Sequence, residues 1–185
     1  MLEDPMKQNV VQPLDKAEFR NVVGHFASGV TIVTAAHDGV RYGATISAVT
    51  SLCDTPPMVL VCVNQKLGTH AAIRKARHFT INILGEDQAS LAHTFATPGA
   101  DKFADVAVHH GRHGPRLAEA LAYLTCRVVD DLEGGTHRIF VAEVVEAQAG
   151  TGNPLSYYRG RFGHFVPYRN AMWRTTQADN AVSPH

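Results

Sequence analysis

About six short runs of β-branched and apolar residues constrain the fold of this chain most strongly. Gly, Pro, Asn and Asp separate the runs, and several connections have the length of a hairpin turn. Helical patterns do not alternate regularly with the runs, which argues against a doubly wound parallel sheet. We expect strands at residues 30–36, 40–46, 58–63, 78–84, 123–132 and 137–149.

Amphipathic segments predict a few short helices beside these strands. The first covers residues 15–26, where Asp15 suits the N-cap and Glu18 follows at capping-box spacing. Its apolar residues recur at helical spacing and form one face: Phe19, Val22, Val23 and Phe26. Two shorter helices are expected at 69–76 and 88–96. The pattern favours a mainly β fold, an antiparallel barrel with peripheral helices.

A chain of 185 residues is most simply one domain. Residues 1–14 are polar, contain two prolines, and are predicted to form an N-terminal arm. The barrel domain is expected to span 15–167, with a polar C-terminal tail at 168–185. Within the domain, the stretch 97–114 is rich in Gly, His and charge and is predicted to be mostly loop.

Charge and hydropathy patterns narrow the classes of partner. The formal net charge is +0 at pH 7, so no basic excess points to nucleic acid or to an anionic membrane surface. We find no apolar run of membrane-spanning length and no signal peptide after Met1. The three cysteines are widely spaced and are expected to be reduced thiols of a cytoplasmic protein.

The absence of several catalytic and metal-binding motifs from the sequence argues against the enzyme classes that depend on them. The sequence lacks a dinucleotide-binding glycine fingerprint, a phosphate-binding P-loop, a zinc-protease helix and a serine-hydrolase elbow. His109, His110 and His113 form the densest histidine cluster, but adjacent histidines on a Gly-rich segment are more often solvated than ligating. We therefore predict no metal site.

The segment 43–57 is the strongest candidate for a ligand site. Small and hydroxyl side chains fill it from Thr45 to Ser51, and Pro56 and Pro57 close it. Small residues let a ligand approach the main chain, and hydroxyls and free backbone N–H groups bind phosphate and polar ring edges. We expect a stiff loop that holds a flat, phosphorylated cofactor.

Seven segments, in order along the chain, carry a family resemblance. The chain resembles the short-chain flavin reductases of two-component monooxygenases, in the FMN-binding split-barrel superfamily. The resemblance implies an antiparallel Greek-key split barrel that forms a homodimer. It also implies reduction of FMN or FAD by NADH or NADPH, with reduced flavin released to a separate monooxygenase. The segments are 26–34, 43–51, 54–57, 79–84, 101–103, 135–137 and 154–160.

The resemblance also implies a set of site residues. Four should line the edge of the flavin ring: Thr45, Ile46, Ser47 and Ala48. Five fall where the family binds the ribityl chain or phosphate: Ser51, Cys53, Asn64, Lys66 and Thr69. Others are expected near the ring or among the cofactor-binding residues: Asn82, Leu84 and Phe103. His137 has the nicotinamide-associated, catalytic position, with two further residues close to it: Tyr158 and Arg159.

Several alternatives stay open at this level. Asn82 could make a purely structural hydrogen bond, His137 could be an ordinary turn residue, and Lys66 could be solvated. Tyr157 and Tyr158 point to opposite faces of an extended segment, so at most one faces the site. A non-catalytic flavin- or haem-binding carrier or sensor is the alternative function, and a flavin oxidase is a third. The sequence does not choose FMN over FAD or NADH over NADPH.

Overall fold

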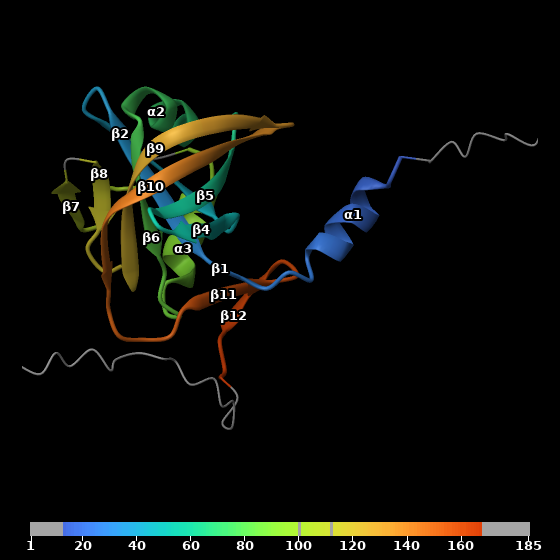
Figure 1. Cartoon of the computed structure of the whole chain (residues 1–185). Coiled ribbons are helices and arrows are strands. Elements are labelled where there is room, and N and C mark those ends of the chain that lie inside the picture. The colour runs from blue at the N-terminus through green and yellow to red at the C-terminus, as the bar shows by residue number, and fades with distance from the viewer. Residues whose placement is uncertain (1–12, 100, 112, 168–185) are drawn as a thin grey trace, which may run out of the picture.

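A computed structural model of the chain describes residues 13–99, 101–111 and 113–167 (Figure 1). The helices within these residues are α1 (Lys16–Val23), α2 (Gly68–Ala76) and α3 (Ala89–Ala96). The strands of the first half are β1 (Ser28–Gly29), β2 (Thr31–His37), β3 (Val40–Ile46), β4 (Val49–Asp54), β5 (Pro57–Asn64) and β6 (His78–Ile83). Those of the second half are β7 (Val108–Gly111), β8 (Gly114–Leu117), β9 (Ala122–Gly134), β10 (His137–Ala149), β11 (Leu155–Tyr158) and β12 (Arg161–His164).

One antiparallel sheet with the strand order β3-β2-β6-β9-β10-β5-β4 forms the body of the protein. Its two edge strands, β3 and β4, follow each other in the chain with only Ser47 and Ala48 between them. A flat sheet of this order would be about 29 Å wide, whereas the connection spans at most about 11 Å. The sheet must therefore roll up, which confirms the predicted mainly β split barrel.

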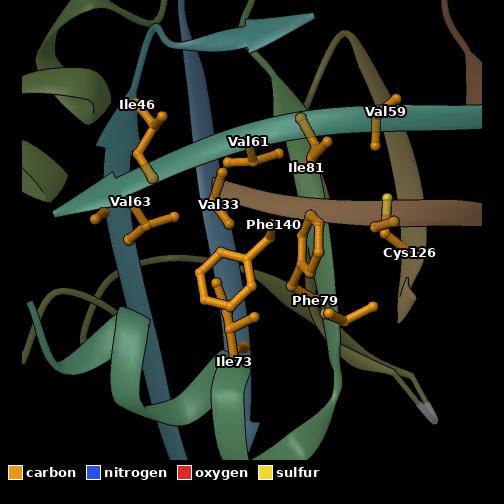
Figure 2. Packing of buried hydrophobic residues seen from close by; sticks show 14 of the residues in the cluster. Val33, Ile46, Val59, Val61, Val63, Ile73, Phe79, Ile81, Cys126 and Phe140 are labelled. Carbon is orange, nitrogen blue, oxygen red and sulfur yellow. The ribbon is translucent and has the colours of Figure 1, made fainter. Parts of the chain in front are cut away.

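The interior of the rolled sheet is a continuous apolar core (Figure 2). Phe79 of β6 and Phe140 of β10 are fully buried, with ring centroids 6.5 Å apart. Ile73 of α2 is also fully buried and extends this core beyond the strands, so α2 covers one opening of the barrel. Valines of β2 and β5 fill the remaining space: Val33, Val59, Val61 and Val63.

A second apolar cluster lies outside the sheet, where α3 covers β2 and β3. Phe95 of α3 and Phe103 meet edge to face, with ring centroids 5.0 Å apart, and both are buried. Gly43 of β3 lies directly beneath them, and a Cβ at this position would come within 2.5 Å of the Phe95 ring. The close packing of α3 on the barrel therefore requires a glycine in β3.

Gly43→Ala is expected to lower the free energy of unfolding by about 1–3 kcal/mol, because the buried rings cannot move aside. In an open strand the same change should be neutral or stabilising. Gly163→Ala in β12 is the matched control, since a Cβ there meets nothing within 4 Å. Urea unfolding measures both. Equal stability of the Gly43 variant and wild type would contradict the packing argument.

One sequence-based expectation for the candidate ligand segment is wrong. Most of 43–57 is not loop, because β3 runs to Ile46 and β4 occupies Val49–Asp54. β4 is an edge strand with mostly exposed side chains, so it lacks the apolar run that identifies buried strands. The described part of 97–114 is mostly loop, as predicted, but it also contains β7, which pairs with β8 in a short hairpin.

The first helix is shorter than predicted and packs differently. Asp15 is its N-cap as expected, because its carboxylate accepts hydrogen bonds from Ala17 N and Glu18 N. The helix ends at Val23, however, and Gly24 is its C-cap. None of its residues is buried, so the predicted apolar face has no partner within the described residues. The predicted arm up to residue 12 and the tail at 168–185 lie outside the described residues.

No helix among the described residues has the length and apolar character needed to cross a membrane. Within the same residues, no group of three or more His, Cys, Asp or Glu side chains is arranged to hold a metal ion.

Candidate functional site

A cavity of about 690 Å³ lies between α1, the β3–β4 connection and the β11–β12 turn. This volume is within the range of small-molecule and cofactor sites. The lining combines apolar side chains with hydroxyl, amide and guanidinium groups. Its residues are Phe19, Arg20, Asn21, Val23, Gly24, Phe26, Ser28, Ser47, Ala48, Tyr157, Arg159 and Gly160.

Ser47 and Ala48 are the part of the predicted ligand segment that faces this cavity. Both are exposed and belong to neither β3 nor β4. Their carbonyl oxygens accept hydrogen bonds from Val49 N and Cys62 N. Among the described residues, neither N–H donates a backbone hydrogen bond. Both N–H groups are therefore free of backbone acceptors in the described part of the chain, and their expected donation to a ligand stays a prediction.

The two preceding residues have structural partners instead. The Thr45 hydroxyl donates to Ala92 O of α3 at 2.6 Å, which ties β3 to that helix. The Ile46 side chain is buried in the barrel core. Because both side chains are engaged within the protein, Thr45 and Ile46 can contact a ligand only through their main-chain atoms. On β4, Ser51 and Cys53 are exposed at the sheet edge and do not line this cavity.

A second group of predicted residues gathers at the end of β5 and the tip of the β9–β10 hairpin. His137 pairs with Asn64 in the β5–β10 ladder. The Asn64 side chain accepts a hydrogen bond from Lys66 N at 2.9 Å, which shapes the turn after β5. The His137 ring lies 3.0 Å from the Thr136 hydroxyl through Nδ1, and its carbonyl accepts from the Gln65 amide. Fixed on both sides, His137 has a defined position beside Asn64.

Charged groups near this second group have shifted pKa values. Burial and the nearby Arg74 and Arg138 lower the pKa of His70, whose ring packs on Phe140. Burial alone would raise the pKa of Asp131, but hydrogen bonds from Arg138 and Arg77 outweigh it and hold that pKa below its usual value. His70 therefore favours the neutral form, and Asp131, on β9 of the hairpin, favours the charged form that pairs with Arg77 and Arg138.

Thr69 and Phe103 line a smaller cavity of about 210 Å³ at the N-terminus of α2. Both side chains are almost fully buried. Lys102, in the same wall, donates a hydrogen bond to Phe95 O at 2.8 Å, and burial lowers its pKa. The Lys102 ammonium is thus committed to the end of α3, and Arg41, in the same wall, lies over the Phe103 ring, 4.9 Å from its centroid.

Asn82 and Leu84 lie inside the protein, with no exposed surface. The Asn82 amide donates to Ile32 O at 2.9 Å and to the Thr34 hydroxyl at 3.1 Å, and its oxygen accepts from Leu117 N at 2.8 Å. These bonds join β6 to β2 and β8. They support the structural alternative for Asn82 and leave its side chain no donor for a flavin ring.

The β11–β12 turn brings Arg159 to the large cavity and separates the two tyrosines. Tyr157 lines the cavity, whereas the Tyr158 ring meets His25 edge-on at 6.1 Å. The alternation of an extended segment predicted that at most one would face the site; Tyr157 is the one that lines this cavity, and the cofactor contact expected of Tyr158 stays a prediction. Sequence reasoning also missed the α1 residues and Ser28, which no ligand-binding motif marks.

Comparisons with known proteins identify the family of the chain. The sequence matches the flavin reductase like domain family over residues 23–165. The chain belongs to the flavin reductase family. It is therefore an enzyme, which decides against the carrier or sensor alternative. The reductase is 97% identical over 185 residues to the reductase component of a 4-nitrophenol 4-monooxygenase/4-nitrocatechol 2-monooxygenase from Rhodococcus opacus, with 100% of both chains covered.

Solved structures give the same assignment for the fold. The NADH:FAD oxidoreductase of Streptomyces globisporus, in complex with NAD and FAD fragments, superimposes with a TM-score of 0.81 at 32% identity. That match covers 87% of the reductase and 99% of the other chain. Nitrilotriacetate monooxygenase component B from Mycobacterium thermoresistibile has the same TM-score and identity, with coverages of 88% and 94%. The fold is thus that of known flavin reductases.

Proposed function

We propose that the reductase uses NADH or NADPH to reduce FMN or FAD and supplies the reduced flavin to a partner monooxygenase. The observation that carries this proposal is the large cavity at the β3–β4 connection, where Ser47 and Ala48 present backbone N–H groups. The name of the 97% identical relative adds the partner class, an oxygenase that acts on 4-nitrophenol and 4-nitrocatechol.

The residues present fit a flavin. When both substrates are bound, a hydride passes from nicotinamide C4 to flavin N5. The N–H groups of Ser47 and Ala48 would donate to the N1–C2=O edge of the flavin ring, where negative charge accumulates. Phe26 and Tyr157 provide apolar surface in the same cavity. The protein's task is to bind and orient two flat molecules, so the lack of a nucleophile or general base is no obstacle.

Oxidation of the nicotinamide tests this proposal directly. Purified protein is mixed with NADH or NADPH, with and without FMN or FAD, and absorbance is followed at the nicotinamide band. Rapid oxidation that requires added flavin is the expected result, and the rates identify both preferred substrates. Flavin binding without oxidation by any of the four pairs would contradict the proposed reaction.

His137 is proposed to contact the nicotinamide. His137→Ala is expected to raise KM for the nicotinamide substrate about 5–10-fold while the flavin Kd stays within about twofold. The matched control is His109→Ala, since His109 is an exposed histidine on β7. Steady-state kinetics and flavin titration measure the two effects. A larger loss of flavin affinity than of nicotinamide affinity would contradict this role.

We also propose that the reductase is a homodimer. α1 buries none of its residues, and Phe26 beyond it is 78% exposed. An isolated helix of this length is not stable in water, so its apolar residues call for a covering surface. Sedimentation at micromolar concentration is expected to give a dimer, and a strict monomer would contradict the proposal.

The cytoplasmic location stays a prediction from the free thiols. One of them, Cys126, is buried, and desolvation raises its pKa to about 12.

A further inference from the structure

α1 contributes to the large cavity although most of it precedes the part of the chain that matches the family. The match begins at residue 23, whereas α1 spans Lys16–Val23. Phe19, Arg20 and Asn21 nevertheless line the cavity opposite Ser47 and Ala48. Figure 1 shows α1 projecting away from the barrel beside the ends of β11 and β12. α1 thus forms one wall of the cavity, although the family match covers only its last residue.

Contacts with the β11–β12 turn hold the end of α1 in place. Arg159 N donates to Gly24 O at 3.1 Å, and the Arg159 guanidinium donates through Nη2 to Asn21 Oδ1 at 3.2 Å. The rings of His25 and Tyr158 meet edge-on beside them. Arg159 therefore connects the helix to the barrel through both its main chain and its side chain.

Arg159 has a backbone conformation that a residue with a long side chain rarely adopts. Its φ is +47° and that of Gly160 is +81°, so both central residues of this two-residue hairpin are left-handed. Such turns favour Asn-Gly, and a long side chain at the first position is disfavoured. Strained residues of this kind concentrate at functional sites.

The charge of the cavity supplies the second observation. Arg20 and Arg159 both line it, and its wall contains no Asp or Glu among the described residues. Within the same part of the chain, neither arginine forms an ion pair. Two guanidinium groups with no carboxylate partner among the described residues, in a chain of formal net charge +0, make this wall locally positive. Guanidinium groups match the geometry of phosphate oxygens.

We propose that Arg20 and Arg159 form an anion subsite for a phosphate or diphosphate group of a substrate, with Asn21 as the positioning residue for Arg159. The proposal rests on the proposed function, because flavin and nicotinamide dinucleotides both carry such a group. It deepens that function by assigning substrate recognition to α1.

The phosphate could belong to the flavin or to the nicotinamide substrate, and equilibrium titration together with steady-state kinetics distinguishes the two. Riboflavin and FMN differ by one phosphate, so their titration isolates the flavin arm, whereas KM for NADH and NADPH reports the nicotinamide arm. Arg20→Gln and Arg159→Asn are each expected to weaken either FMN or the nicotinamide substrate about 5–20-fold. Riboflavin affinity should stay unchanged. Lys16→Gln, which removes a positive charge from α1 outside the cavity, is the matched control.

Arg159→Asn separates recognition from folding. Asn-Gly suits this turn better than Arg-Gly, so the thermal midpoint should be at or above that of wild type while phosphate-dependent affinity falls. A lowered midpoint together with equal losses for riboflavin and FMN would assign Arg159 a purely structural role and overturn the proposal. Unchanged affinity for FMN, NADH and NADPH in both arginine variants would also overturn it.

Asn21→Ala tests the positioning role. Loss of its acceptor should raise KM for the affected substrate with kcat unchanged, and inorganic pyrophosphate should compete less well for the site. An unchanged KM would remove Asn21 from the proposal. If wild type fails to oxidise NADH and NADPH, the proposed function fails, but equilibrium titration of wild type and both arginine variants with riboflavin, FMN, NADH and NADPH still decides the anion subsite.

Discussion

Ser47→Trp is expected to abolish flavin binding, with Kd raised at least about 100-fold, while the far-ultraviolet circular dichroism spectrum stays native. Ser47 lines the large cavity and is exposed in the two-residue connection between β3 and β4. An indole at this position would occupy the space that a flavin ring needs beside the backbone donors. The fold should tolerate it, because Ser47 belongs to no strand and packs in neither apolar cluster. Flavin titration followed by fluorescence measures the effect.

Thr94→Trp is the matched control for this change. Thr94 is exposed on α3, lines none of the cavities described above, and bonds only to Ser90 O of its own helix. Its Trp variant should bind flavin as wild type does. Retained flavin binding in the Ser47 variant would show that the flavin lies elsewhere, with the cavity at the start of α2 as the next candidate.

The sequence predicted the barrel because its central strands carry strong local signals. β2, β5 and β6 are apolar runs bounded by turn residues, and their buried faces form the observed core. The edge strand β4 was missed because exposed residues dominate it, and β7 because Gly and His obscure its pairing with β8. Strands stabilised mainly by backbone pairing leave little trace in hydrophobic patterning.

The sequence indicated which kinds of residue would form the site, but not which distant elements would come together around it. Ser47 and Ala48 face the cavity because small residues connect two edge strands there. Asn82, by contrast, was expected near the flavin ring from its position in the sequence alone. The packing of β8 over β6 shows that its amide instead makes hydrogen bonds with Ile32 O and Leu117 N inside the protein. The wall formed by Arg20 depends on how α1 lies against the β11–β12 turn. Such long-range placement is not encoded in any local motif.

Asn82→Leu is expected to lower the free energy of unfolding by about 2–4 kcal/mol. Leu has the same branched shape, with two methyl groups in place of the amide oxygen and nitrogen, so Ile32 O and Leu117 N lose the amide that now pairs with them. The Asn82 side chain has no exposed surface. Water therefore cannot reach these two groups to replace the lost hydrogen bonds unless the contact between β6 and β8 opens. Urea unfolding gives the free energy, and flavin titration well below the unfolding midpoint gives Kd.

The comparison of these two quantities decides what Asn82 does. A structural role predicts a large loss of stability with flavin Kd within about twofold of wild type. Asn153→Leu is the matched control, because Asn153 is exposed and its amide reaches only the Glu86 carboxylate, so its stability should change by less than about 0.5 kcal/mol. Wild-type stability with a large loss of flavin affinity in Asn82→Leu would restore the ring contact and contradict the structural role. Because Asn82 joins β2, β6 and β8 outside the barrel core, its loss should loosen the β7–β8 hairpin before the barrel itself unfolds.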